Sequence, residues 1–330
     1  MSLLPLSLAC WNYDRTEALA NGSVRPEGID LNFQALEVEE TFFRMLRHHE
    51  FDAAELSMSS YCVTLARDNP PFVAIPVFPS RLFRHSCIFV SAQSGIERPE
   101  DLVGKRIGVP EYQMTAPVWI RGILQDEYGV DPASVTYFTG GEEQPGREEK
   151  LKLDLPEKFR LEPISPDKTL SRMLADGEID ALHTARTPST FYSEPDAVRR
   201  LFPDFVPVEK DYYTRTGIFP IMHVVALRRE VYEANRWIAR SLFKAFCEAQ
   251  RRLYDELLIT ASLKTMLPWQ IAAVEETVAL LGEDWWPYGF SRNRAAIDTF
   301  LRYHHEQGLS SRRLQPEELF AEETFESFLI

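Results

Sequence analysis

GIFPIMHVVAL, residues 217–227, is an apolar run between the polar triplets TRT (214–216) and RRE (228–230). Its last four residues, 224–227, predict a buried strand of a parallel sheet, because such strands are apolar on both faces. Pro220 has no backbone N–H to give to a ladder, so we expect the strand to begin after it. His223 then stands where the strand starts. A single histidine in an apolar run is typical of a hydrogen-bonded core residue, so this stretch alone favours a structural role.

The composition is that of a globular protein with an acidic surface. The 330 residues are 45% hydrophobic and include 36 Lys+Arg against 50 Asp+Glu, which gives a formal net charge of −14. This charge disfavours nucleic acid and anionic membrane surfaces as partners, and an anionic substrate would need a local cluster of arginines. No stretch approaches the roughly 20 apolar residues that span a bilayer. We therefore expect one large domain or two domains, with no membrane segment.

The N-terminal residues MSLLPLSLAC faintly resemble a lipoprotein signal that ends at Cys10. They have no Lys or Arg before the apolar part, and Pro5 interrupts it, so a first core strand over 6–10 explains them better. We therefore expect a cytoplasmic protein. The four cysteines have no paired spacing, which fits neither a disulfide framework nor a zinc site and predicts reduced thiols.

Polar side chains follow two early strands. The first strand is followed directly by Trp11, Asn12, Tyr13, Asp14 and Arg15, at the end where open α/β sheets bind ligands. The alternative is an ordinary strand–helix turn in which Asp14 caps the helix that follows. The segment 51–61 (FDAAELSMSSY) predicts a strand that leads into a helix. Its serines, among them Ser57, either cap that helix or receive a carboxylate at its N-terminus.

The connector 79–86 (PSRLFRHS) places Arg81, Arg84 and His85 between two apolar runs, 72–78 and 87–90. Two guanidinium groups this close form either a solvated loop or an anion site, and we weigh the two equally.

The middle of the chain alternates between regular and irregular segments. Residues 117–128 predict a helix, preceded by Tyr112 and Thr115, and residues 170–182 (LSRMLADGEIDAL) predict a helix that stops at Gly177 and then a strand. His183 and Arg186 follow that strand, and the chain is turn-rich from there to residue 213. Segment 139–168, dense in Gly, Pro and charge, predicts a surface insertion or a flap. Helical spacing then recurs over 232–258, 270–281 and 293–304.

Several of these segments together resemble a known family. GEIDAL, preceded by DLVGKRIGVP, is similar to the type II periplasmic binding protein fold. VFPSRLFRHS, GGEEQPGR, GEIDALHTAR, FPIMHVV, WWPYGFSRN and the closing EQGL and PEELF resemble 4,5-dihydroxyphthalate decarboxylases, from Leu6 to Phe320. The resemblance implies an α/β protein of two lobes, with two chain crossings near 81–86 and 219–223 and a ligand cleft between the lobes. Lobe 1 would comprise 1–83 and 222–330, and lobe 2 would comprise 84–221. It also suggests a homo-oligomer.

The resemblance implies a small aromatic acid as substrate and a reaction that needs no organic cofactor. Direct loss of CO2 would leave an unstable aryl anion, whereas protonation of the ring carbon lets a para hydroxyl act as the electron sink. We expect His223 to be the proton donor, with His85 as the second candidate, and Arg81 and Arg84 to hold carboxylates. The expected wall residues are Asn12, Glu55, Ser57, Tyr112, Thr115, His183, Arg186, Trp286 and Tyr288.

Two other functions fit the same sequence. The first is a cytoplasmic binding protein or sensor that uses the cleft without chemistry, since a fold does not imply a function. The second is a metal-assisted decarboxylase or lyase, although no His/Asp/Glu spacing indicates a metal site, and we expect none.

Overall fold

The computed structural model describes residues 2–325, which form two compact α/β units. Unit 1 takes in Met1–Arg81, Ile221–Ala295 and Gln315–Ile330, and unit 2 takes in Leu82–Pro220 and Ala296–Leu314. The chain thus leaves unit 1 after Arg81 and returns at Ile221, close to the two predicted crossings. It then enters unit 2 once more, over 296–314, which the sequence had placed in lobe 1. The division into lobes at 83/84 and 221/222 stays a prediction.

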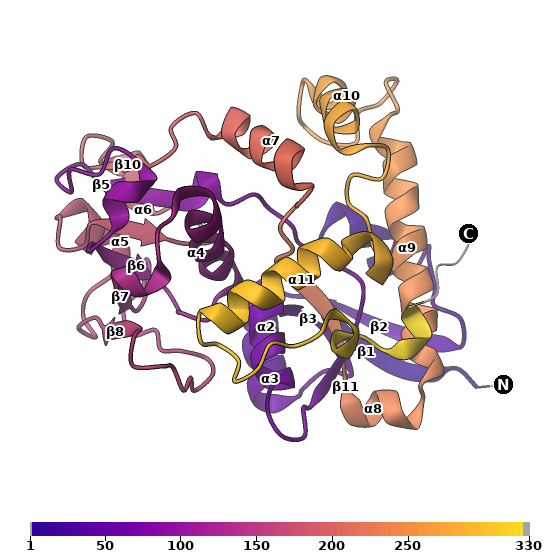
Figure 1. Cartoon of the computed structure of the whole chain (residues 1–330). Helices are drawn as coiled ribbons and strands as arrows, with labels where there is room; N and C mark the ends of the chain where they lie inside the picture. Colours follow the sequence, from indigo (N-terminus) through magenta and orange to yellow (C-terminus); the bar gives the residue numbers. More distant parts are fainter. Residues whose placement is uncertain (1, 326–330) are drawn as a thin grey trace. The chain divides into compact units, whose positions relative to one another are not determined.

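Unit 1 is built on a five-stranded sheet of order β2-β1-β3-β11-β4 (Figure 1). Strands β1, β2 and β3 run parallel, in register from Leu4↔Ile29 to Cys10↔Ala35 between β1 and β2. The apolar segments of the sequence form the buried strands, and β4 is shorter than the apolar segment 72–78 that predicted it. The strands are β1 (Leu4–Cys10), β2 (Ile29–Ala35), β3 (Ala53–Ser57), β4 (Phe72–Ile75) and β11 (His223–Arg228).

Strand β11 begins at His223, after Pro220 as predicted, but it runs antiparallel to both β3 and β4. The expectation of a parallel strand is wrong. Its residues 224–227 are fully buried, and an apolar sequence reports burial on both faces of a sheet, not the direction of the strand. Figure 1 shows β11, from late in the chain, between strands from its beginning.

The helices of unit 1 cover this sheet. Helix α2 packs on β1 and β3, and α3 follows β3 directly, with the Ser57 hydroxyl accepting a hydrogen bond from the Ser60 N–H. Helix α9 packs on α8, α10 and the first short helices. The segment expected as one helix over 232–258 is two, α8 and α9, which Asn235 separates with a non-helical backbone. The helices are α1 (Glu17–Ala20), α2 (Val38–His48), α3 (Met58–Leu65), α8 (Arg229–Ala234), α9 (Trp237–Leu257) and α10 (Gln270–Leu281).

Unit 2 contains a six-stranded mixed sheet of order β10-β5-β9-β6-β7-β8. Strands β9, β6, β7 and β8 run parallel, whereas β5 is antiparallel to β9 and to β10. The strands are β5 (Ile88–Ser91), β6 (Arg106–Val109), β7 (Thr136–Thr139), β8 (Arg160–Pro163), β9 (Ala181–His183) and β10 (Val198–Arg200). The helices are α4 (Thr115–Tyr128), α5 (Leu170–Ala175), α6 (Ser189–Ser193) and α7 (Phe205–Thr216).

Helix α11 (Phe290–Glu306) explains why residues 296–314 group with unit 2. Phe300 and Tyr303 of this helix pack against the Trp119 ring of α4 at 5.4 and 5.7 Å between centroids. A Cβ at Gly122 would lie 2.1 Å from the Tyr303 ring, so only glycine allows this approach. Helical spacing predicts α11, but it does not show that the apolar face of this helix packs against α4.

Two segments that looked irregular contain regular structure. Segment 139–168 includes β8, an edge strand that carries Arg160 and Glu162 and does not need two apolar faces. The turn-rich region up to residue 213 includes α6, β10 and most of α7. Pro207 lies in the first turn of α7, where a proline removes no helical hydrogen bond.

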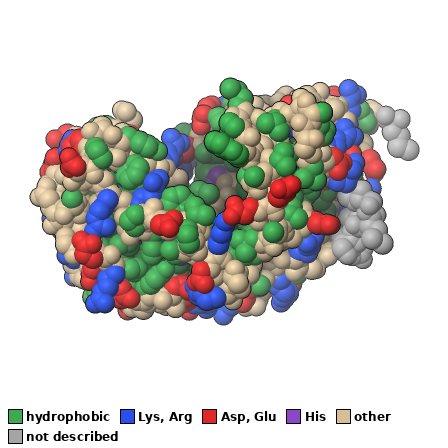
Figure 2. All heavy atoms as spheres, turned by 90° about the horizontal axis from the view of Figure 1, so that it is seen from above, with side chains coloured by type: hydrophobic (Ala, Val, Ile, Leu, Met, Phe, Trp, Pro, Cys, Tyr) green, Lys and Arg blue, Asp and Glu red, His purple; other side chains and the backbone are tan. Residues whose placement is uncertain are grey.

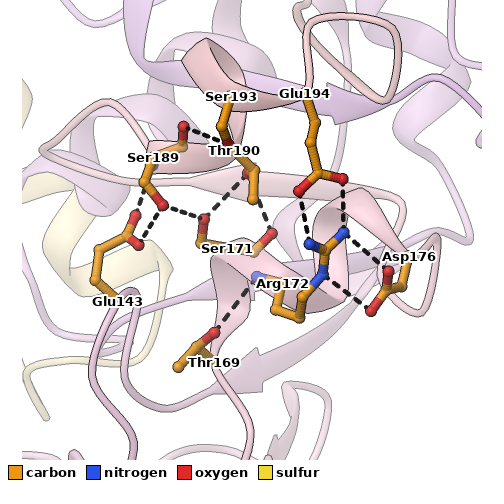
Figure 3. Close-up of polar contacts among 9 residues, drawn as sticks. All are labelled: Glu143, Thr169, Ser171, Arg172, Asp176, Ser189, Thr190, Ser193 and Glu194. Carbon is orange, nitrogen blue, oxygen red and sulfur yellow. Dashed lines mark hydrogen bonds and ion pairs between the residues drawn. The ribbon is translucent and has the colours of Figure 1, made fainter.

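Polar contacts fasten α6 to α5 in unit 2 (Figure 3). The Ser171 hydroxyl of α5 lies 3.0 Å from that of Thr190 and 3.4 Å from that of Ser189. Arg172 binds both carboxylate oxygens of Glu194 at 2.6 and 2.9 Å. These contacts add to the apolar packing of α5, whose Leu170 and Leu174 lie in the core of unit 2.

Figure 2 shows Lys and Arg side chains interspersed with Asp and Glu on the face seen, which agrees with the many surface ion pairs. None of the helices within residues 2–325 has the length and apolar character to cross a bilayer.

Candidate active site

Glu55 and His223 meet on one face of the unit 1 sheet. In the register of β3 and β11, Val225 lies opposite Glu55 and His223 lies opposite Ser57. Glu55 and His223 are therefore diagonal neighbours, a spacing that long side chains bridge. Glu55 Oε1 lies 2.6 Å from His223 Nδ1.

The Glu55 carboxylate is fully buried and surrounded by donors. The last residue of β1, which pairs with β3, and the residues just after it supply three of them. Glu55 accepts hydrogen bonds from the Trp11 N–H at 3.0 Å, the Tyr13 hydroxyl at 2.7 Å and the Cys10 thiol at 3.4 Å. Burial by itself would raise the pKa of Glu55, but the charge of His223 and these hydrogen bonds outweigh it and hold the pKa below its usual range. Glu55 is therefore a carboxylate at neutral pH.

This carboxylate fixes the tautomer of His223. An ionised Glu55 can only accept, so Nδ1 of His223 carries a proton. Among the residues that the structure describes, Nε2 has no hydrogen-bond partner, and the side chain is 17% exposed. The Phe42 ring packs at 4.9 Å and 86° to the imidazole. The imidazole is thus held at one nitrogen and can exchange a proton at the other.

Tyr13 and Cys10 act as neutral donors. Burial and the neighbouring Glu55 charge raise the pKa of each above its ordinary value. Sequence reasoning missed both, together with Arg15, although it placed Tyr13 and Arg15 after a strand at an edge where ligands bind. Their position just after a strand was the sequence feature that could have identified them as site residues.

Arg15 lies beside Tyr13. Its guanidinium carbon is 4.0 Å from the centroid of the Tyr13 ring and 4.4 Å from that of the Trp286 ring. Trp286 donates its indole N–H to the Phe78 carbonyl at 2.8 Å. The Tyr288 hydroxyl is buried and unpartnered within the described chain, and the charge of Arg15 acts on it. Trp286 and Tyr288, two of the predicted wall residues, therefore lie in the same part of unit 1 as Arg15.

Arg81 has a different environment in unit 1. It is 5% exposed, and its Nη2 donates to the Pro287 carbonyl at 2.9 Å and to the Asn293 side chain. These contacts tie the first crossing segment to the turn before α11. A carboxylate-binding role for Arg81 stays a prediction, as does a wall role for Asn12, which is exposed, and for Ser57, which caps α3.

Arg84 and His85 lie in unit 2 and are both buried. The rings of Phe202 and Tyr212 pack on His85 at 5.3 and 5.4 Å. Burial, and then the charge of Arg215, lower the pKa of His85 to about 4. A neutral imidazole between aromatic rings resembles a core histidine, and its role as a proton donor stays a prediction.

His183 and Arg186 follow β9 as predicted. His183 is buried, and burial and then Arg121 lower its pKa to about 3. Arg186 is exposed. Between them, the Thr184 hydroxyl donates to Glu142, a buried residue that sequence reasoning missed.

Tyr112 and Thr115 lie before and at the start of α4, and both are buried. The Tyr112 hydroxyl donates to the Gln307 carbonyl at 3.2 Å, and its ring lies 4.0 Å from the Arg121 guanidinium. These are contacts within unit 2, and a role in substrate binding stays a prediction for both residues. Within the described residues, no three His, Cys, Asp or Glu side chains gather as a metal site would require.

Comparison with known proteins relates the whole chain to one group of enzymes. It is 44% identical over 330 residues to a 4,5-dihydroxyphthalate decarboxylase of Comamonas testosteroni, with all of both chains covered. It is 45% identical over 213 residues to a protein of the same name from Pseudomonas putida, covering 64% of this chain and 83% of that one. A family model described as NMT1/THI5 like matches residues 18–144.

Solved structures identify the architecture. A sulfonate-binding protein SsuA from Methylobacillus flagellatus has a TM-score of 0.57 at 14% identity, covering 97% of this chain and 92% of that one. The aliphatic sulphonate binding protein SsuA of Escherichia coli has a TM-score of 0.54 at 13% identity, with 98% and 99% covered. These likenesses and the two α/β sheets confirm the type II periplasmic binding protein fold.

Proposed function

Because this chain belongs to the 4,5-dihydroxyphthalate decarboxylase family and is a carboxy-lyase, we propose that it converts 4,5-dihydroxyphthalate to protocatechuate and CO2 without a cofactor. Identity of 44% over the full length of both chains supports the substrate. The hydrogen-bonded Glu55–His223 pair is the observation that carries the mechanism.

The substrate chemistry requires a proton on the ring before CO2 leaves. Breaking the bond between ring and carboxylate first would place an electron pair in an aryl σ orbital, with no resonance stabilisation. A proton added to the carboxylate-bearing carbon, as the para hydroxyl loses its own, gives a dienone. The C–C bond then breaks, its electrons restore the aromatic ring, and the para oxygen regains a proton. The enzyme must therefore hold an acid over the ring.

His223 is that acid in the proposal. In the protonated imidazole, Nδ1 donates to Glu55 and Nε2 carries the proton that moves to the ring carbon. The buried Glu55 carboxylate stabilises the imidazolium and orients it, and the four donors around Glu55 keep it ionised. After CO2 has left, a proton returns to His223 from solvent, because its side chain is partly exposed.

The test is CO2 release and product analysis with 4,5-dihydroxyphthalate and a panel of hydroxybenzoates. The wild type releases CO2 and a catechol acid, and His223→Gln loses at least about 100-fold in kcat, since a positioned proton donor contributes about this much. His48→Ala, at an exposed histidine on α2, is the matched control and keeps full activity. Full activity of His223→Gln contradicts the mechanism. Binding of unchanged substrate with no CO2 contradicts the function and favours a sensor.

A further inference from the structure

We propose that Arg15 binds the carboxylate that the substrate keeps, and so selects aromatic acids with two adjacent carboxylates. This inference rests on the proposed function and assigns a residue to its substrate specificity. The sequence predicts that task for Arg81 and Arg84. Arg81 also donates hydrogen bonds to Pro287 and Asn293 in the structure.

Arg15 has N–H donors that no described residue accepts. A guanidinium has five N–H donors. Nε donates to the Pro79 carbonyl at 2.6 Å and Nη1 to Asp14 Oδ1 at 3.0 Å. The other donors, on Nη1 and Nη2, have no partner among the described residues. The two hydrogens of Nη2 and the second hydrogen of Nη1 are therefore available to a carboxylate, the anion that a guanidinium binds best.

The Asp14 contact does not satisfy Arg15. Asp14 is 42% exposed, and an ion pair at the surface contributes little because water screens it. The Arg15 side chain is only 15% exposed, so much of its hydration is already lost. A guanidinium that has lost water but keeps free donors binds an anion more strongly than a solvated one. In a chain of net charge −14, such a cation is also what an anionic substrate requires.

Two aromatic rings hold the guanidinium in place. Its carbon lies over the Tyr13 ring and over the Trp286 ring, at 4.0 and 4.4 Å from the ring centroids. Trp286 is itself fixed, because its N–H donates to the Phe78 carbonyl and its carbonyl accepts from Gln250 at 2.7 Å. The side-chain entropy of Arg15 is therefore already lost before a ligand arrives, which favours binding.

The same residues connect Arg15 to the reacting groups. Tyr13, stacked on Arg15, donates to Glu55 Oε1, the oxygen that also holds His223. Adjacent carboxylates on a benzene ring lie close together. In the proposal, the retained carboxylate therefore binds Arg15 while His223 protonates the ring carbon that bears the other carboxylate. The nearby Tyr288 hydroxyl is 7% exposed and has no partner within the described chain, so it offers a second polar group to a ligand.

The test is binding of phthalate, measured by isothermal titration calorimetry on the full chain. Phthalate keeps both carboxylates but has no hydroxyl to act as electron sink, so it binds without reacting. Arg15→Met is expected to weaken phthalate binding by roughly 10- to 100-fold, the range for charge-assisted hydrogen bonds, with Arg15→Lys in between. The matched control is Arg25→Met, at an exposed arginine of unit 1, which leaves binding unchanged. Circular dichroism verifies that each variant is folded.

Kinetics with 4,5-dihydroxyphthalate give the second measurement. Loss of Arg15 should raise KM far more than it lowers kcat, because the retained carboxylate is charged before and after the reaction. Wild-type affinity of Arg15→Met for phthalate, no binding of phthalate by the wild type, or a fall in kcat with unchanged KM would each overturn the proposal. If the wild type binds phthalate through Arg15 but releases no CO2 from any acid, the proposed function fails while the Arg15 site stands.

Discussion

Glu55 Oε1 and His223 Nδ1 lie 2.6 Å apart because β3 and β11 run antiparallel and place the two residues diagonally on one face of their sheet. The residues are 168 positions apart in the sequence. The chain passes through unit 2 between these two residues. The antiparallel direction of β11 then brings His223 next to the Glu55 carboxylate.

Glu55→Gln should lower kcat by about 100-fold or more, because a neutral amide orients the imidazole but does not stabilise its charge. Steady-state CO2 release measures this effect. Glu27→Gln, at an exposed carboxylate of the same unit, is the control and should leave kcat unchanged. A Glu55→Gln enzyme with wild-type kcat, shown to be folded by its circular dichroism, would refute a role for the carboxylate in the reaction.

His85→Gln should keep kcat within a few-fold of the wild type, since burial and Arg215 lower the pKa of His85 to about 4 and leave it neutral. An unfolded histidine has a pKa near 6.5. Because the unfolded chain then binds more protons, His85 costs stability as pH falls from about 6.5 to about 4, and the variant should lose less stability there. Urea unfolding at pH 7 and pH 5 measures this. A loss of kcat as large as that of His223→Gln would make His85 the proton donor instead.

Glu142→Gln should change how stability depends on pH in the opposite direction. Burial raises the pKa of Glu142 to about 7, against the hydrogen bond from Thr184. Between about pH 4.5 and 7 the folded chain then binds more protons than the unfolded chain, so stability falls as pH rises through this window. The variant keeps an oxygen acceptor for Thr184 and should gain on the order of 2 kcal/mol relative to the wild type at pH 8. Glu148→Gln, at an exposed carboxylate of the same loop, should show no such gain.

The expected homo-oligomer has a candidate surface in the segment between α9 and α10. Large apolar side chains are exposed there: Leu258, Ile259, Leu263, Met266, Leu267 and Trp269. Such a cluster is typical of protein interfaces and uncommon on monomers. The double variant Met266→Glu, Trp269→Glu should therefore have a smaller mass than the wild type in light scattering coupled to size-exclusion chromatography. Val103→Glu, at an exposed apolar residue of unit 2, is the control, and equal masses for all three proteins would refute this interface.

Most elements of the fold could be predicted from local patterns. The run at 6–10, the strand–helix unit at 51–61 and the helix–Gly–strand segment at 170–182 all appear as elements close to their predicted places. Helix α10 has the predicted bounds. Alternation and helical spacing are properties of consecutive residues. They can therefore be recognised without knowing which other strands or helices pack against the segment. Sequence reasoning missed α7, because a proline in its first turn is typical of a loop. It also missed the edge strand β8, because its charged residues break the apolar pattern of a buried strand.

The sequence by itself also determined the ingredients of the site: a histidine at the start of a buried strand, and polar and aromatic residues after β1. The tertiary structure decided how they combine. In it β11 runs antiparallel, Glu55 is hydrogen-bonded to His223, Arg15 contacts the rings of Tyr13 and Trp286, and residues 296–314 belong to unit 2. The physical reason is that hydrogen bonds and ring contacts between residues far apart in the chain depend on strand order and direction, and a local pattern records only burial.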